Sequence, residues 1–138
     1  MANSVKNRVA LVTGASSGLC NELAHQFLAK GAFVVGGFRK PEQAKAFEST
    51  NLDRAMGIVM DVTDKDAVAA GIQSVIDRFQ RIDIVANCAG VGIVGAVEET
   101  SESEAREIFD SNFFGGLAVN RAALPTMRRQ QSGHFLQF

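Results

Sequence analysis

Apolar positions along the chain alternate between short continuous runs and longer stretches with helical spacing. The run Val9–Val12 has the length of a strand, and the apolar positions after it recur every three or four residues, as in an amphipathic helix. Similar short runs predict further strands, at 33–35, 55–60, 82–86 and 134–138. Because these runs are nearly all apolar, they are typical of parallel strands that are covered on both faces.

The segments between the runs carry the start signals of helices. After the first run, Leu19, Leu23 and Phe27 share one helical face. Pro41 suits the first turn of a short helix that ends near Phe47. Thr63-x-x-Asp66 predicts a capping box, and the apolar positions behind it define an amphipathic helix, with Val68, Ile72, Val75, Ile76 and Phe79 on one face.

The last predicted helix is long and unusually apolar. Ser101-x-x-Glu104 is a second capping box, and we expect the helix behind it to reach about Arg129. It has to continue across two adjacent glycines and a proline, and it is apolar around most of its girth, with Ile108, Phe109, Phe113, Phe114, Leu117, Val119 and Leu124.

Strands and helices in alternation predict an α/β fold, a doubly wound parallel sheet with right-handed connections. We expect the strand order 3-2-1-4-5, with a ligand crevice where strands 1 and 4 part. The loops after Val12, Val35, Met60 and Ala86 then open on the same edge of the sheet. A length of 138 residues predicts one domain, over residues 1–138, which ends within the fifth strand.

The first strand is followed by a small, flexible segment, Thr13-Gly14-Ala15-Ser16-Ser17-Gly18. Strand, glycine turn and helix together form the layout of a nucleotide-phosphate cradle, because glycine lets backbone N–H groups approach a pyrophosphate. The helix N-terminus adds unpaired donors and a partial positive charge. Two glycines alone are equally consistent with an ordinary turn.

Composition narrows the range of partners and compartments. The net charge of −1 argues against a nucleic-acid or anionic-membrane partner. The start MANSVKNR lacks the apolar stretch of a signal peptide, and no segment is long enough to span a bilayer. Cys20 and Cys88 do not make a disulfide framework, so we expect a reducing, cytoplasmic location. No metal-ligand spacing is present, and we expect no metal.

Four motifs along the whole chain resemble, in order and spacing, those of the short-chain dehydrogenase/reductase family. They are TGASSGLC, MDVTD, ANCAG and FDSNFFG. The resemblance implies a Rossmann-like NAD(P)-binding domain and an oxidoreductase. Thr13, Gly14 and Gly18 match the family's cofactor loop, with Leu19 beside them. Ser16 and Ser17 either donate hydroxyls to phosphate or merely begin the helix. Cys20 replaces a third glycine, which requires either a shift of the helix or a gap that the thiol fills.

Two further loops carry candidate cofactor contacts. Arg39 and Lys40 follow the second strand where an NAD-preferring enzyme places a carboxylate, so we expect NADP rather than NAD, an ordinary solvated pair being the alternative. The resemblance implies that Asp61 accepts from the adenine amino group and that Val62 packs on the ring. Asp61 is equally suited to a turn or capping role.

The loop after the fourth strand matches the family's Asn-Asn-Ala-Gly motif, with Cys88 in place of the second Asn. The resemblance implies that Asn87 braces this strand and that Ala89 and Gly90 let the backbone approach the nicotinamide ribose. We interpret Cys88 as a small buried residue rather than a nucleophile, because no basic partner is apparent. Asn112 matches the family's helix-distorting proton-relay position; otherwise it is a surface residue.

The family's catalytic Ser and Tyr-x-x-x-Lys come after the fifth strand, and this chain has no tyrosine. We therefore expect the cofactor-binding portion of an NADP-dependent carbonyl reductase or alcohol dehydrogenase, inactive alone. A non-catalytic NADP-binding regulatory module is the alternative. A phospho-receiver domain fits poorly, because Thr13 and Gly14 stand where an acidic pair is needed. The resemblance also implies a homo-oligomer through the helix at 102–130.

Overall fold

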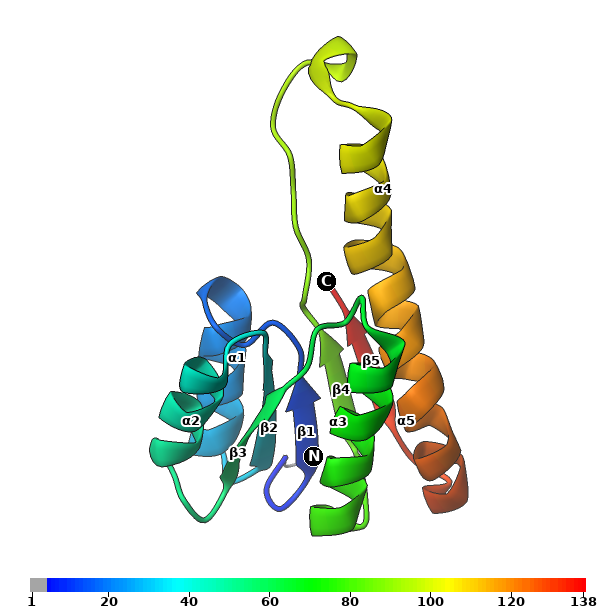
Figure 1. Cartoon of the computed structure of the whole chain (residues 1–138). Coiled ribbons are helices and arrows are strands. Elements are labelled where there is room, and N and C mark those ends of the chain that lie inside the picture. Colours follow the sequence, from blue (N-terminus) through cyan, green and yellow to red (C-terminus); the bar gives the residue numbers. More distant parts are fainter. Residues whose placement is uncertain (1–4) are drawn as a thin grey trace.

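The computed structural model describes residues 5–138 as a parallel sheet with helices on both faces (Figure 1). Residues 1–4 of the polar start lie outside the described part. The sheet has five strands in the order β3-β2-β1-β4-β5, as the sequence predicts. The strands are β1 (Val9–Val12), β2 (Phe33–Phe38), β3 (Ala55–Val59), β4 (Ile84–Asn87) and β5 (His134–Gln137).

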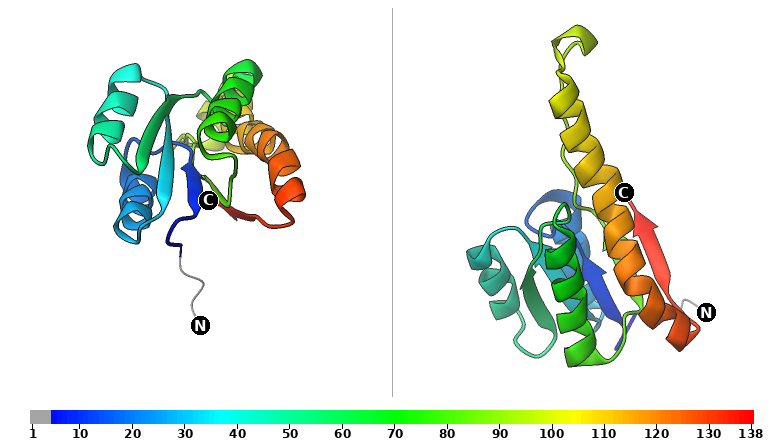
Figure 2. Two further views of the ribbon diagram at one scale, coloured as in Figure 1. Left: turned by 90° about the horizontal axis from the view of Figure 1, so that it is seen from below. Right: turned by 45° about the vertical axis from the view of Figure 1, so that its right-hand side comes forward.

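Two helices cover each face of the sheet (Figures 1 and 2). On one face lie α1 (Gly18–Ala29) and α2 (Pro41–Ser49), and on the other α3 (Lys65–Phe79) and α5 (Gly116–Gln130). Alternate residues of β1 enter two separate cores: Val9 and Leu11 pack on the α3 and α5 side, Ala10 and Val12 on the α1 and α2 side. Both faces of β1 are therefore buried, which explains its continuous apolar run.

The long helical segment keeps its direction across three consecutive elements. These are α4 (Glu102–Phe109), the π-helix η2 (Asp110–Gly115) and α5, which continues past Pro125. The predicted capping box at Ser101 is confirmed: its hydroxyl accepts from the Glu104 N–H, and the Glu104 carboxylate accepts from the Ser101 N–H. With the short helix η1 (Val97–Glu99), α4 projects well beyond the sheet (Figure 2).

Two local predictions are wrong. The N-cap of α3 is Asp64 rather than Thr63, because the Asp64 carboxylate accepts from two backbone N–H groups while the Thr63 hydroxyl donates to Asp61. On α1 the buried face runs through Cys20, Ala24 and Phe27, and Leu19 is 66% exposed. In the first turn of α1 the smaller side chain, that of Cys20, therefore faces the sheet, and the larger side chain of Leu19 faces solvent.

Within residues 5–138, no helix is both long and apolar enough to cross a membrane. The same residues contain no cluster of side chains that suits a metal ion.

Candidate functional site

A cleft of about 1060 Å³ opens at the carboxyl ends of the strands, above β1 and β4, the neighbouring strands whose following helices α1 and α5 lie on opposite faces of the sheet. This volume lies just above the usual range of small-molecule sites, about 300–1,000 Å³. The cleft contains ten of the candidate residues from the sequence: Gly14, Ser16, Ser17, Leu19, Arg39, Lys40, Asp61, Val62, Ala89 and Gly90. We refer to it below as the crevice.

Gly14 is the position where the crevice needs a glycine most strictly. Its φ of +64° lies in the left-handed region, and a Cβ there would stand 2.8 Å from the Cα of Ala89. Real Cβ atoms do not approach backbone so closely, so the loop after β1 fits against the end of β4 only without a side chain. Gly18 also has a positive φ, +61°, but a Cβ there would meet open space.

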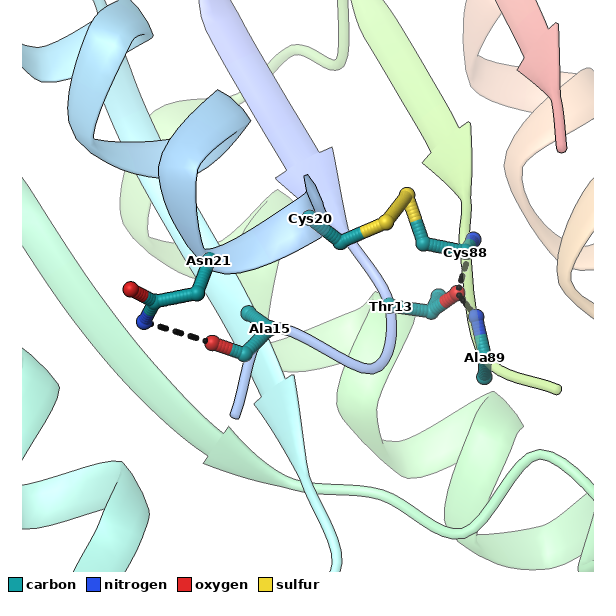
Figure 3. Close-up of a disulfide and its surroundings, with 6 residues drawn as sticks. All are labelled: Thr13, Ala15, Cys20, Asn21, Cys88 and Ala89. Atoms are coloured by element: carbon teal, nitrogen blue, oxygen red, sulfur yellow. Dashed lines mark hydrogen bonds between the residues drawn. A yellow bond between two sulfur atoms is a disulfide. The ribbon is translucent and has the colours of Figure 1, made fainter. Parts of the chain in front are cut away.

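Thr13 joins the same two segments from below the crevice. Its hydroxyl oxygen accepts hydrogen bonds from the N–H groups of Cys88 and Ala89, both at 3.0 Å (Figure 3). The Thr13 N–H donates to Ala86 O, which continues the ladder between β1 and β4. Thr13 is buried and does not line the crevice. It holds the glycine loop and the 88–90 segment in a fixed relation.

The first turn of α1 faces the crevice. Ser17 is the N-cap residue, and its side chain makes no capping hydrogen bond. The hydroxyls of Ser16 and Ser17 are exposed on the crevice wall, and the first turn of α1 contains no acidic residue. Unpaired N–H donors, hydroxyls and the helix dipole suit an anionic group at this point.

On the far side of the crevice, Arg39 and Lys40 are exposed at the end of β2. Asp61 follows β3, the strand paired with β2, and lies close enough to Arg39 to feel its charge. Hydrogen bonds from the Thr63 N–H (2.9 Å) and hydroxyl (2.8 Å) lower the pKa of Asp61, and the positive charge of Arg39 adds to this effect. The Asp61 side chain is thus held as an ionised acceptor at the crevice wall.

Besides Thr13, three further candidate residues lie outside the crevice. Asn87 is buried on the opposite side of β4, where its amide donates to Asn120 of α5 and Gln137 of β5. Gly18 forms the start of α1 and does not line the cleft. Asn112 lies in the π-helix η2, and its side chain makes two hydrogen bonds with the backbone of Val91, both at 2.8 Å.

The prediction for the two cysteines is wrong in one respect. Cys20 and Cys88 are not two free thiols. They form a disulfide, with Cα atoms 6.0 Å apart (Figure 3). The parallel topology brings the first turn of α1 next to the end of β4, although 68 residues separate the cysteines in sequence. The sulfur of Cys20, at the position of the family's third glycine, is accommodated by its bond to Cys88 at the end of β4.

Sequence reasoning also missed other residues that line the crevice. Most of them lie at the end of β2 or after β2, β3 or β4, and they share the carboxyl edge with the motifs, a position that the predicted topology implies. The residues from the α4–η2 segment lean over the edge and have no local sequence signal. The missed residues are Cys20, Gly37, Phe38, Gln43, Met60, Thr63, Cys88, Val91, Glu107, Asp110 and Ser111.

Comparisons with known proteins agree with this geometry. The sequence model of the short chain dehydrogenase family matches residues 8–137. A solved short-chain dehydrogenase from Streptomyces avermitilis superposes with a TM-score of 0.89 and 39% identity, over 94% of this chain and 48% of that one.

Two curated relatives show the extent of the match. Dehydrogenase/reductase SDR family member 7B from Bos taurus is 32% identical, over 94% of this chain and 43% of its own length. A 3-ketodihydrosphingosine reductase from Bacteroides thetaiotaomicron is 34% identical, over 94% of this chain and 45% of its own length. The chain therefore spans less than half the length of these relatives. With the family model covering nearly all of it, the chain belongs to the short-chain dehydrogenase/reductase family of oxidoreductases, which use an NAD(P) cofactor.

Proposed function

We propose that the protein is an NADP(H)-dependent oxidoreductase that interconverts a carbonyl and an alcohol, and that these 138 residues are its cofactor-binding portion. The observation that carries the proposal is the Gly14 cradle, where the backbone closes on Ala89 so tightly that no Cβ fits. The loop therefore presents backbone rather than side chains to the crevice. When bound, the nicotinamide would supply hydride transfer.

Each wall of the crevice has a role in this proposal. The N–H groups of the glycine loop and of the first turn of α1 hold the pyrophosphate, with hydroxyls from Ser16 and Ser17. Asp61 accepts from the adenine amino group, and Val62 packs against the ring. Ala89 and Gly90 leave room for the nicotinamide ribose.

The NADP preference rests on the charge at the end of β2. Arg39 and Lys40 are exposed there, and the segment from Phe33 to Lys40 contains no carboxylate to hold a ribose 2′-hydroxyl. A guanidinium binds a phosphate through two parallel hydrogen bonds, so Arg39 suits a 2′-phosphate.

We expect Arg39→Glu to weaken NADPH binding about 10–100-fold, because a hydrogen bond to a charged group contributes about 1.5–3 kcal/mol. Binding of NADH, which lacks the 2′-phosphate, should not weaken. Fluorescence titrations of both nucleotides measure the two Kd values. Lys45→Glu, on the exposed side of α2 and outside the crevice, makes the same charge change and should leave both values nearly unchanged. Equal losses for NADPH and NADH in Arg39→Glu would contradict the assignment.

In this proposal Asn112 contributes to proton transfer rather than to cofactor binding. Its side chain is engaged with Val91, so within the π-helix η2 it holds the segment after β4 against the helix. We propose that this contact keeps the proton-relay position in place. A protein made of these residues alone has no tyrosine to donate a proton, and we expect it to bind the cofactor without turnover.

We also propose a homo-oligomer that forms through the helical segment at 102–130. Phe109 is 62% exposed, and Phe113 and Phe114 are also exposed beside it, on a helix that projects from the body of the protein (Figure 1). Sedimentation velocity should show species larger than a monomer whose proportion rises with concentration. Phe113→Glu should shift the distribution toward monomer, because burying a charge at an apolar contact is costly. A wild-type monomer that is independent of concentration would contradict this proposal.

A further inference from the structure

The disulfide joins the two segments that form opposite sides of the proposed pyrophosphate and ribose sites. Cys20 stands in the first turn of α1, directly after the glycine loop, and Cys88 follows the last residue of β4 (Figure 3). Both residues line the crevice. The bond therefore ties the helix N-terminus to the segment that Thr13 also contacts.

The bond forms part of the floor of the crevice rather than an obstacle within it. Cys20 is only 9% exposed and belongs to the core cluster that includes Ala10, Val12 and Ala24, with Cys88 packed against that cluster. Cys88 is half-buried and lines the crevice, and we expect a small thiol to approach its sulfur from that side. The bond is thus positioned to support the loop and remains open to exchange.

Reduction would alter this floor. Two unbonded heavy atoms need a separation of about 3.5–4.0 Å, which is more than a covalent bond spans. On reduction, either the first turn of α1 moves away from β4 or one thiol rotates into the crevice. Either change displaces the loop amides or occupies space that the cofactor requires. A disulfide holds these amides in place before the ligand arrives, and such preorganisation favours binding.

We propose that Cys20 and Cys88 are a reversible redox pair and that oxidation raises the affinity of the crevice for the dinucleotide about tenfold. This inference rests on the proposed function, since the ligand is the NADP of that proposal.

The redox step is a thiol–disulfide exchange with a low-molecular-weight disulfide such as oxidised glutathione. One protein thiolate attacks the glutathione disulfide, releases one glutathione thiolate and forms a mixed disulfide. The second protein thiolate then attacks the protein sulfur of that mixed disulfide and releases the second glutathione. Two protein thiols are oxidised by two electrons, one glutathione disulfide is reduced to two thiols, and the protons remain balanced.

Thermodynamic linkage adds an independent readout. If oxidation tightens dinucleotide binding tenfold, a saturating dinucleotide must make the disulfide harder to reduce by the same factor. For a two-electron couple, tenfold corresponds to a shift of about 30 mV in midpoint. NADP⁺ is the appropriate probe, because it carries no hydride that could reduce the bond.

The experiment places the protein in glutathione buffers of graded ratio, with and without NADP⁺. Acid quenching and alkylation followed by mass spectrometry count the free thiols, and calorimetry gives the NADP⁺ Kd in the fully oxidised and fully reduced states. We expect both thiols to disappear together, a Kd about tenfold lower in the oxidised state, and a midpoint shifted about 30 mV by NADP⁺. In the double variant Cys20→Ala/Cys88→Ala, which has no thiol left to exchange, the Kd should not depend on the glutathione ratio.

The outcomes of this experiment distinguish a failure of this inference from a failure of the proposed function. Thiols that stay alkylatable at every ratio, or a Kd that is equal in both states, would overturn the redox pair while leaving NADP binding intact. An absence of NADP⁺ binding in both states would overturn the proposed function and, with it, the effect on affinity. Thiol counting would still decide whether the two cysteines exchange reversibly.

Discussion

Gly14→Val should weaken NADPH binding about 100-fold or more, the loss expected when two hydrogen bonds from loop amides to a charged phosphate, about 1.5–3 kcal/mol each, are no longer made. The valine Cβ would meet the Ala89 Cα at 2.8 Å, and the φ of +64° adds strain for any branched side chain. The loop must then retreat from β4 and carry its amides out of position. Fluorescence titration with NADPH measures the loss.

Two further glycines provide the controls. At Gly92 nothing lies within 4 Å of a Cβ and no positive φ is present, so Gly92→Val should bind normally. Gly18→Ala has the positive φ but open space, and we expect an intermediate loss of affinity. Circular dichroism should show that all three variants are folded. A folded Gly14→Val that binds NADPH as well as Gly92→Val would contradict the role of the cradle.

Asp83→Ala should lower the free energy of unfolding by about 3 kcal/mol, because it removes charge-assisted hydrogen bonds and leaves a buried N–H group unpaired. Asp83, directly before β4, is 2% exposed. Its carboxylate accepts from Arg81 at 2.8 and 2.6 Å and from the Val9 N–H at 2.9 Å, and Arg8 lies 3.5 Å away. The side chain thus joins the beginnings of β1 and β4.

Urea unfolding followed by circular dichroism measures this change. Asp83→Asn keeps an acceptor for the Val9 N–H and should cost less than Asp83→Ala. Asp77→Ala, at an exposed position of α3, should change stability by no more than about 0.5 kcal/mol. A loss in Asp83→Ala no larger than that of Asp77→Ala would show that the contact contributes little.

The same residue predicts a pH dependence. Burial raises the pKa of Asp83, but the hydrogen bonds from Arg81 and Val9 and the nearby positive charges outweigh it, so the pKa lies below its ordinary value. The folded state therefore favours the ionised form. Its stabilising contribution is complete above the unfolded pKa of about 3.9 and is lost as the pH falls through the lower folded pKa. Asp83→Asn should lose less stability than the wild type on acidification.

Much of the fold follows from local patterns. Continuous apolar runs identify buried parallel strands, and strict right-handed connections leave few arrangements, so the strand order follows. Once the order is set, the loops after β1, β2, β3 and β4 must share one edge. For this reason Gly14, Arg39, Asp61 and Ala89 could be grouped from the sequence and lie together in the crevice.

The features that were not predicted from the sequence depend on contacts between distant segments. The Cys20–Cys88 bond requires a distance between two elements that no local pattern contains. The choice of Asp64 over Thr63 as N-cap depends on Asp61, which captures the Thr63 hydroxyl. The exposure of Leu19 depends on how closely α1 approaches the sheet. In each case the residue's interaction partner lies outside the sequence pattern from which its role was predicted.

Hydrogen–deuterium exchange of the wild-type protein with and without NADPH tests the central claim most directly. The claim is that the backbone from Gly14 to Cys20 holds the pyrophosphate of NADP. The account predicts slower exchange in peptides covering residues 13–20 and 88–91 when NADPH is present, with no change in the distant second half of α3. Unchanged exchange at 13–20 in the presence of saturating NADPH would contradict it.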